Sequence, residues 1–274
     1  MTQLIGDRLV VMGRTDVGCV RTLNEDCYAI DPRVGLLLVA DGMGGHEAGE
    51  VASARVIELV RENLAKTLAP PPRPVQESCL RLPSGHDPDE PTLDDLPNPV
   101  FQMVRKAIHA ANADVNLVNR DKGFENGTGM GTTVVGLWLP DFSDTPVVFH
   151  VGDSRLYRFH ARKLIQVTRD HSMYQQWLSM GKKGPRPSQN ILLQAIGPAR
   201  NLTPDIHFQE MVEGDVILLC SDGLYGMVGQ DRIAEILARA TPSNLEEIST
   251  ELISMAKAGG GKDNITLIVG LCIR

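Results

Sequence analysis

Three aspartates lie where strongly apolar segments of the chain end or begin. Asp41 follows "LLLVA", Asp222 follows "VILLCS" and Asp263 precedes "NITLIV". A carboxylate at the edge of a buried segment needs partners, because burying a lone charge is costly. Few cations are nearby in the sequence, and a divalent metal would satisfy all three carboxylates together. Carboxylate, carbonyl and water oxygens suit hard cations such as Mg²⁺ and Mn²⁺, so the pattern predicts a metal site.

An ordinary turn is the competing interpretation of the pairs Asp41–Gly42 and Asp222–Gly223, because Asp-Gly after a strand is a common turn signal. For either pair alone, a turn is at least as good an explanation. The three aspartates taken together favour the metal site. Glycine also lets a backbone approach closely, which makes the Gly42 carbonyl a further candidate ligand.

More charged residues lie in "VRTLNED" and "HVGDSR". The first segment places Arg21 beside the adjacent carboxylates Glu25 and Asp26, and the second places Asp153 after the apolar run "VVFHV". The adjacent pair is either a solvated turn or a set of further metal ligands. In the second case, the neighbouring guanidinium could bind a phosphate through two parallel hydrogen bonds.

The apolar periodicity predicts the elements that position these residues. Many strand-like segments alternate with two helices early in the chain and two late, which indicates the α+β class with sheets packed together and helices outside. Strands are expected over 8–15, 27–31 and 35–41, in several short segments of 131–168, and over 214–222 and 264–273. Helices are expected over 47–68, 101–118, 231–240 and 244–258, with a shorter one over 171–180.

Bulk properties narrow the class of protein. The chain has 274 residues, enough for one large domain or two small ones. Its net charge is -7 and it has no basic patch, so nucleic acid is not an expected partner. Its five cysteines are scattered, as is typical of reduced thiols in a cytoplasmic protein. No segment reads as a signal peptide, a membrane anchor or an apolar run of about 18 residues.

The ordered motifs "RTLNED", "VADGMGGHEAGE", "GTTVV", "HVGDSRLYR", "VTRDHS", "LLCSDGL" and "KDNIT" carry a family resemblance. Because of these motifs, taken together and in this order, the chain resembles the metal-dependent serine/threonine protein phosphatases of the PP2C-like (PPM) family, in their bacterial form. The resemblance runs from Arg21 to Thr266. It therefore implies a single domain over 1–274, in which the Pro- and acid-rich segment at about 69–99 is an insertion.

The resemblance implies a fold and a set of ligands. The fold is a central β-sandwich of two antiparallel sheets flanked by helices on both outer faces, with the active site at one end and a flap at about 171–192. Two Mn²⁺ or Mg²⁺ ions are implied, together with a third, weaker ion. The implied metal ligands are Glu25, Asp41 as the bridge, the Gly42 carbonyl, Asp153, Asp222 and Asp263.

The resemblance also implies the remaining roles. Asp26 would hold ligand waters, Asn264 would orient Asp263, and Arg21 would bind the substrate phosphate. Arg21, Asp41, Asp222 and Asp263 would be the catalytic residues, with direct attack of a metal-bridging hydroxide on phosphorus. Many eukaryotic members have a histidine at the position of Met43. The general acid is therefore open between His46, a metal-bound water and no dedicated residue.

The implied activity is that of a protein-serine/threonine phosphatase acting on phosphoserine and phosphothreonine proteins in bacterial signalling. The implied counterpart is a Ser/Thr kinase with its targets, and we expect a monomer. The main alternative is a non-catalytic phosphopeptide-binding regulatory homologue, which would be expected to have lost a metal-bearing carboxylate. A thiol phosphatase reaction at Cys27 is disfavoured, because Glu25 and Asp26 precede it and Pro32 removes a backbone donor.

Overall fold

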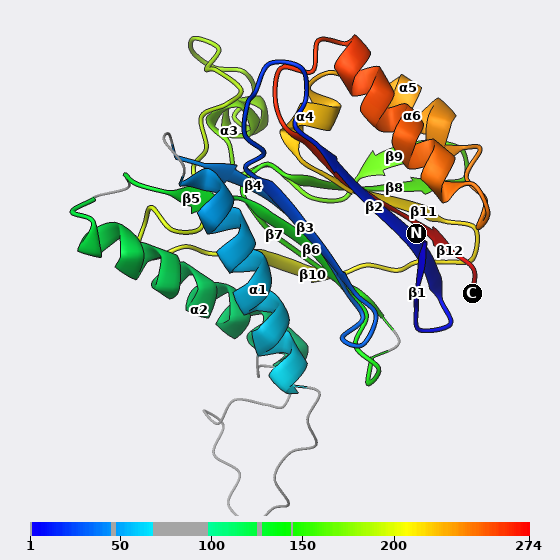
Figure 1. The fold of residues 1–274 in the computed structure, drawn as a ribbon, viewed down its shortest axis with the longest axis horizontal. Coiled ribbons are helices and arrows are strands. Elements are labelled where there is room, and N and C mark those ends of the chain that lie inside the picture. Colours follow the sequence, from blue (N-terminus) through cyan, green and yellow to red (C-terminus); the bar gives the residue numbers. More distant parts are fainter. Residues whose placement is uncertain (1, 45–47, 68–97, 125–127, 144) are drawn as a thin grey trace, which may run out of the picture.

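The computed structural model describes residues 2–44, 48–67, 98–124, 128–143 and 145–274. Two antiparallel sheets face each other in the middle of the molecule (Figure 1). The first sheet has the strand order β1-β2-β12-β11-β8-β9, and the second has the order β10-β7-β6-β4-β3, with β5 paired to β4. The expected α+β sandwich of two antiparallel sheets is therefore confirmed.

The strands of the first sheet are β1 (Gln3–Ile5), β2 (Leu9–Asp16), β8 (Arg155–His160), β9 (Lys163–Gln166), β11 (Val216–Cys220) and β12 (Ile265–Cys272). Those of the second are β3 (Asp26–Asp31), β4 (Leu36–Met43), β5 (Gly131–Thr132), β6 (Val134–Trp138), β7 (Val147–Val151) and β10 (Asp205–Phe208). The short strands β1, β5 and β10 have no clear periodicity, and the sequence did not predict them individually.

Helices cover both outer faces of the sandwich (Figure 1). The second sheet packs against α1 (Gly49–Thr67) and α2 (Pro99–Asp121), and the first packs against α5 (Gln230–Leu237) and α6 (Leu245–Ala258). Two short helices, α3 (Met173–Ser179) and α4 (Asp222–Tyr225), lie near one end of the sandwich. No helix in the described ranges is long and apolar enough to cross a membrane.

The layering explains why the central strands read as continuous apolar runs. In β11, Ile217 and Leu219 belong to the core between the sheets, whereas Leu218 faces the core under α5 and α6. Successive side chains of a strand point to opposite faces, and both faces of this strand are covered. An uninterrupted apolar segment is therefore what this position requires.

The start of α2 corrects one predicted boundary. The Asn98 side chain accepts a hydrogen bond from the Val100 backbone N–H at 2.9 Å, and Pro99 occupies the first helical turn. Both features favour a helix start. The helix predicted over 101–118 therefore begins two residues earlier, at Pro99, and most of the predicted insertion at about 69–99 lies outside the described residues.

Candidate active site

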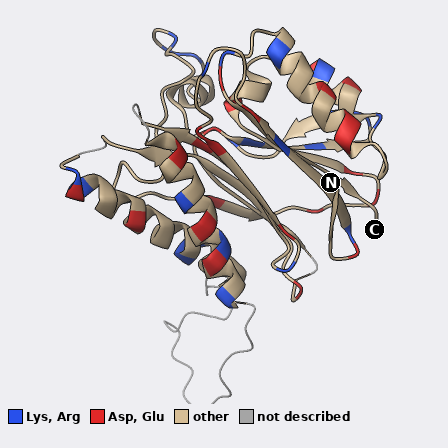
Figure 2. Ribbon diagram, in the orientation of Figure 1, with Lys and Arg blue, Asp and Glu red and all other residues tan. Residues whose placement is uncertain are grey.

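Strand ends from both sheets gather carboxylates at one end of the sandwich. Asp26 begins β3 and is the register partner of Asp41 in β4, both in the second sheet. Asp222 and Asp263 lie beside the first sheet, because Asp222 opens α4 two residues after β11 and Asp263 is two residues before β12. Asp153 lies in the connection from β7 to β8, which crosses between the sheets. The structure thus brings together residues that are far apart in the sequence, and acidic segments mark this end (Figure 2).

Neither Asp–Gly pair forms the turn that the competing interpretation proposed. Asp41 and Gly42 are inside β4, and Asp222 and Gly223 open α4. The glycines are required by close packing instead. A Cβ atom on Gly42 would lie 2.2 Å from the Gly49 carbonyl oxygen, and one on Gly223 would lie 1.9 Å from the Asn264 carbonyl oxygen.

The backbone of Asp41 is fixed by its neighbours on the adjoining strands. Its N–H donates to Thr133 Oγ1 at 3.1 Å, and its carbonyl accepts from Thr132 Oγ1 at 2.8 Å and from the Thr133 N–H at 2.9 Å. Burial raises the pKa of the Asp41 carboxyl well above its usual range, and repulsion from Asp26 and Asp222 raises it further. The carboxylate is therefore rigidly placed among groups of its own charge.

The neighbouring carboxyls are perturbed in the same direction. Burial is the main cause in each case, raising the pKa of Asp26 to about 7, that of Asp153 to about 7 and that of Asp222 to about 6. Repulsion from Asp222 adds to the effect at Asp26 and Asp153, although Ser221 Oγ donates to Asp26 Oδ2 at 2.7 Å and partly offsets it. The positive charges of Arg21 and Arg155 offset this repulsion only in part, and the oxygen donors of the site fit a hard divalent cation.

The Arg21 guanidinium contacts two carboxylates of the site, those of Asp263 and Glu25. Its Nη2 donates to Asp263 Oδ2 at 2.8 Å, and its Nη1 is 3.8 Å from Glu25 Oε2. The Arg21 side chain keeps 46% of its surface exposed. The guanidinium therefore belongs to the site, where it contacts Asp263 and Glu25. Its expected contact with a substrate phosphate remains a prediction.

Asn264 has a larger role than the sequence suggested. Its backbone N–H donates to Asp263 Oδ1 at 2.9 Å, so the backbone amide orients Asp263. Its side chain accepts from the Glu25 N–H at 2.8 Å and donates to the carbonyls of Val17 at 3.1 Å and Leu23 at 2.8 Å. The buried Asn264 side chain thereby holds the loop that carries the arginine and the glutamate against the first sheet.

We expect Asn264→Ala to loosen this loop. Three hydrogen bonds are lost and the Glu25 N–H loses its acceptor, which costs about 1–3 kcal/mol. For a protein of this size, that lowers the unfolding temperature by about 2–4 °C per kcal/mol, and we also expect a higher metal concentration for half-maximal activity. Asn63→Ala is the control, because the Asn63 side chain bonds only the Leu59 carbonyl within α1. Indistinguishable behaviour of the two variants would contradict this role.

Sequence reasoning missed a second positioning group. Arg155 donates from Nε and Nη2 to Asp170 at 2.9 and 2.7 Å, and its guanidinium lies 3.6 Å from the centre of the Tyr225 ring. Tyr225 in turn donates from its hydroxyl to the Asp153 carbonyl at 3.0 Å. The motifs "GDSR" and "RDHS" contain Arg155 and Asp170, but no spacing rule links an arginine and an aspartate across a strand pair.

The predicted flap lies beside the carboxylates. Gln189 and Asn190 line a cavity of about 240 Å³ together with Asp153, Asp222 and Asp263. The basic residues of the loop are exposed, and Arg186 stacks loosely over the Tyr174 ring at 5.0 Å. This agrees with a solvated charged loop.

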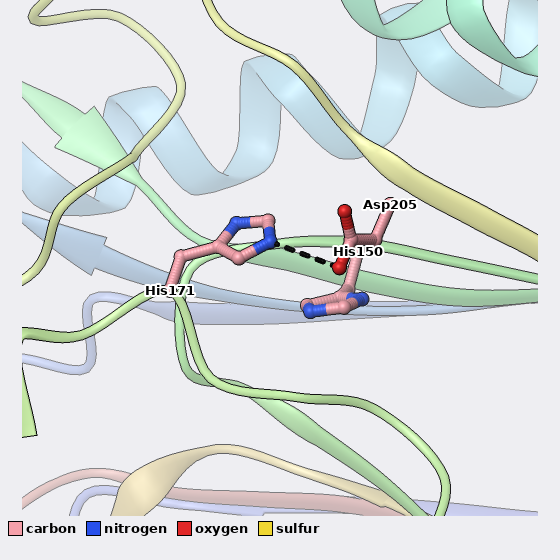
Figure 3. Close-up of side chains that lie close together, drawn as sticks. All are labelled: His150, His171 and Asp205. Atoms are coloured by element: carbon pink, nitrogen blue, oxygen red, sulfur yellow. Dashed lines mark ion pairs between the residues drawn. The ribbon is translucent and has the colours of Figure 1, made fainter. Parts of the chain in front are cut away.

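A different group of possible metal ligands lies at the base of the flap (Figure 3). In the described part of the chain, His150, His171 and Asp205 are the one group of three such side chains whose ligand atoms all lie within 4.8 Å of one another. The Gly152 N–H donates to His171 Nδ1 at 3.3 Å, so the His171 proton is on Nε2, which faces Asp205 Oδ2 at 3.4 Å. His150 Nε2 donates to the Arg169 carbonyl at 2.8 Å. These bonds support a structural, flap-supporting role for His171.

Two further sequence predictions have different outcomes. His46, the candidate general acid, lies outside the described residues. Cys27 is half-buried in β3, and burial raises the pKa of its thiol. A raised pKa lowers the thiolate fraction, which agrees with discounting a thiol mechanism.

The fold is that of bacterial serine/threonine phosphatases. The structure superposes on the Mycobacterium tuberculosis serine/threonine phosphatase PstP/Ppp with a TM-score of 0.76 at 28% identity, covering 97% of this chain and 100% of that one. A PstP catalytic domain in complex with two manganese ions matches with a TM-score of 0.73 at 31% identity, covering 97% and 99% of the two chains.

Sequence comparison gives the family. The model of the protein phosphatase 2C family matches residues 20–255. The serine/threonine phosphatase stp of Listeria monocytogenes is 32% identical over 264 residues, 93% of each chain. Protein phosphatase PhpP of Streptococcus pneumoniae is 30% identical over 261 residues, 92% of this chain and 93% of that one. This chain belongs to the protein phosphatase 2C family, which confirms the resemblance.

Proposed function

We propose that this protein is a metal-dependent serine/threonine protein phosphatase, a phosphoric monoester hydrolase acting on phosphoserine and phosphothreonine proteins. The observation that carries the proposal is the convergence of Asp41, Asp153, Asp222 and Asp263 at one end of the sandwich. Relatives named as serine/threonine phosphatases over almost the whole chain support it. A non-catalytic regulatory role is not favoured, because this chain retains each of those carboxylates.

The chemistry of the donor set fits two Mn²⁺ or Mg²⁺ ions and a third, weaker ion. The raised pKa values of the buried carboxyls indicate oxygen donors that are short of compensating positive charge. Asp41 would be the shared ligand, and Asp222 and Asp263 would hold one ion. The other proposed ligands are Glu25 and the Gly42 carbonyl at the metal pair and Asp153 at the third ion.

Divalent cations held by these residues would supply Lewis-acid polarisation and would lower the pKa of a bound water. Arg21 is half-exposed and can leave Asp263 to bind the phosphate oxygens through parallel hydrogen bonds. Asp26, held by Ser221, is placed to orient waters in the site. Water attacks phosphorus in line with the departing serine or threonine oxygen, without a phospho-enzyme intermediate. His46 stays a candidate for protonating that oxygen.

Further parts of the proposal concern the setting of the enzyme. We propose one domain over 1–274, because the proposed ligands come from both sheets. We propose a cytoplasmic monomer that opposes a bacterial Ser/Thr kinase. The thiols of Cys19, Cys27, Cys220 and Cys272 are free, as is typical of a reducing compartment.

Phosphate release from a phosphothreonine peptide tests the activity. The purified protein is treated with chelator and then supplied with Mn²⁺, Mg²⁺ or neither ion. We expect turnover only when one of the two ions is restored. Absence of turnover with both ions, or turnover that survives chelation, would contradict the proposal.

A further inference from the structure

An apolar groove continues from the acidic cavity along the end of the second sheet. It has a volume of about 440 Å³ and is lined by Met43 and by residues 190–195, 198–199 and 201–202. Asn190 lines both this groove and the acidic cavity, so the two hollows adjoin. Met43 is the last residue of β4, two positions after Asp41. The groove therefore begins next to the proposed metal ligands.

The groove is lined by uncharged side chains, whereas the cavity is lined by carboxylates. Ile191 and Leu193 form part of the groove wall and remain 44% and 49% exposed, although large aliphatic side chains are usually buried. Clustered exposed apolar residues beside a polar site mark a place where an apolar group binds.

The groove is held in shape by hydrogen bonds that run to buried asparagines of α2. Asn112 Nδ2 donates to the carbonyls of Ala199 and Arg200 at 3.0 Å each, and its Oδ1 accepts from the Gly197 N–H at 2.8 Å. Asn119, two turns further along the helix, donates to the Gly197 carbonyl at 3.2 Å. Both side chains are 1% exposed.

The segment of the groove around Gln194 is also held by hydrogen bonds. Gln194 Oε1 accepts from the Thr203 N–H at 2.7 Å, which links the two segments that form the groove. Ile196 and Thr132 exchange backbone hydrogen bonds of 2.9 and 3.0 Å, which join this region to β5 and thus to β4. A preformed groove loses less conformational freedom on binding than a mobile one, so its shape is suited to selecting a ligand.

We propose that this groove binds one large aliphatic side chain of the substrate peptide, within about three residues of the phosphorylated residue. An extended peptide advances about 3.3 Å per residue, so a chain whose phosphate enters the acidic cavity reaches the adjoining groove within a few positions. The inference rests on the proposed phosphatase function and adds a substrate preference to it: leucine or isoleucine near the phosphoresidue.

The test compares phosphothreonine peptides that carry a single leucine at each position from three before to three after the phosphoresidue, in an alanine background. We expect one position at which leucine raises kcat/KM about tenfold over the all-alanine peptide, equivalent to about 1.4 kcal/mol. Leu193→Ser, which shortens the wall, and Ala199→Leu, which fills the groove, should each reduce this ratio to near one. Leu117→Ser alters a leucine of similar exposure, 55%, on α2 and should keep the wild-type ratio.

The outcomes separate this inference from the function on which it rests. Hydrolysis of p-nitrophenyl phosphate, which is too small to reach the groove, reports on the phosphatase reaction alone. If that substrate and all peptides are inert, the proposed function fails and the inference fails with it. If p-nitrophenyl phosphate is hydrolysed but leucine has no effect, or its effect survives both groove variants, the groove assignment is overturned. A shift of Leu193→Ser from dimer to monomer in sedimentation, without a change in the leucine ratio, would assign the groove to a second copy instead.

Discussion

Replacing Asp41 by asparagine is expected to abolish metal-dependent turnover and, at the same time, to stabilise the metal-free protein. The proposed shared ligand is lost, so we expect kcat for a phosphothreonine peptide to fall by about 1000-fold or more, about 4 kcal/mol of transition-state stabilisation. In the metal-free protein, the raised pKa of Asp41 means that folding opposes its ionisation. An amide of nearly the same shape removes that penalty, so we expect about 1 kcal/mol or more of added stability near pH 8.

The opposite signs of these two effects make the prediction specific. Kinetics and calorimetry of chelated protein measure them separately. Asp121→Asn is the matched control, because Asp121 is an exposed residue at the end of α2 and should change neither quantity. An Asp41→Asn variant that turns over normally, or one that is folded but less stable than the parent without metal, would show that Asp41 does not lie in an uncompensated carboxylate cluster.

The pH dependence of the metal-free protein carries the second large effect. Asp26 and Asp153 have pKa values raised to about 7, that of Asp222 is raised to about 6, and that of Asp41 lies well above its usual range. A carboxyl whose folded pKa is raised stabilises the fold below its unfolded value, near 3.8, and loses that contribution as the pH rises through the folded value. We therefore expect chelated protein to lose about 2–3 kcal/mol between pH 6.5 and 8.

The window starts at pH 6.5 because His150 acts in the opposite direction below it. Burial lowers the pKa of His150 to about 4, so acidification towards that value destabilises the fold. Unfolding temperatures of chelated protein at pH 6.5, 7.2 and 8 measure the effect, with Mn²⁺-saturated protein as the reference. Ionised carboxylates bind the cation, so the slope should disappear when the metal is bound. Asp153→Asn should reduce the slope in metal-free protein, and a flat or rising trend in the parent would contradict the prediction.

The carboxylates of the site were predictable because the sequence places each at the edge of an apolar run. Asp41 and Asp222 each follow an apolar segment that is buried on both faces. A carboxylate at such a place is itself buried, and it needs a partner of opposite charge. The same reasoning left the turn open as an alternative. What excludes the turn is the strand pairing of Asp41 with Asp26 and of Gly42 with Thr132, which continues β4 past the aspartate and which no local pattern reveals.

The supporting interactions were not predictable, for the same physical reason. Asn264 bonds the loop around Glu25, and Arg155 bonds Asp170, through contacts that depend on how strands of both sheets are arranged. The short helix α4 was missed because its four residues show no periodicity. Local propensity gives the long elements, and tertiary packing decides the short ones.

Anomalous diffraction from a Mn²⁺-soaked crystal tests the central claim most directly, because this structure offers two places for a cation. We predict two manganese peaks about 3.5–4 Å apart, both within ligand distance of Asp41. Peaks confined to the space between His150, His171 and Asp205, or no peak within ligand distance of Asp41, would contradict the account.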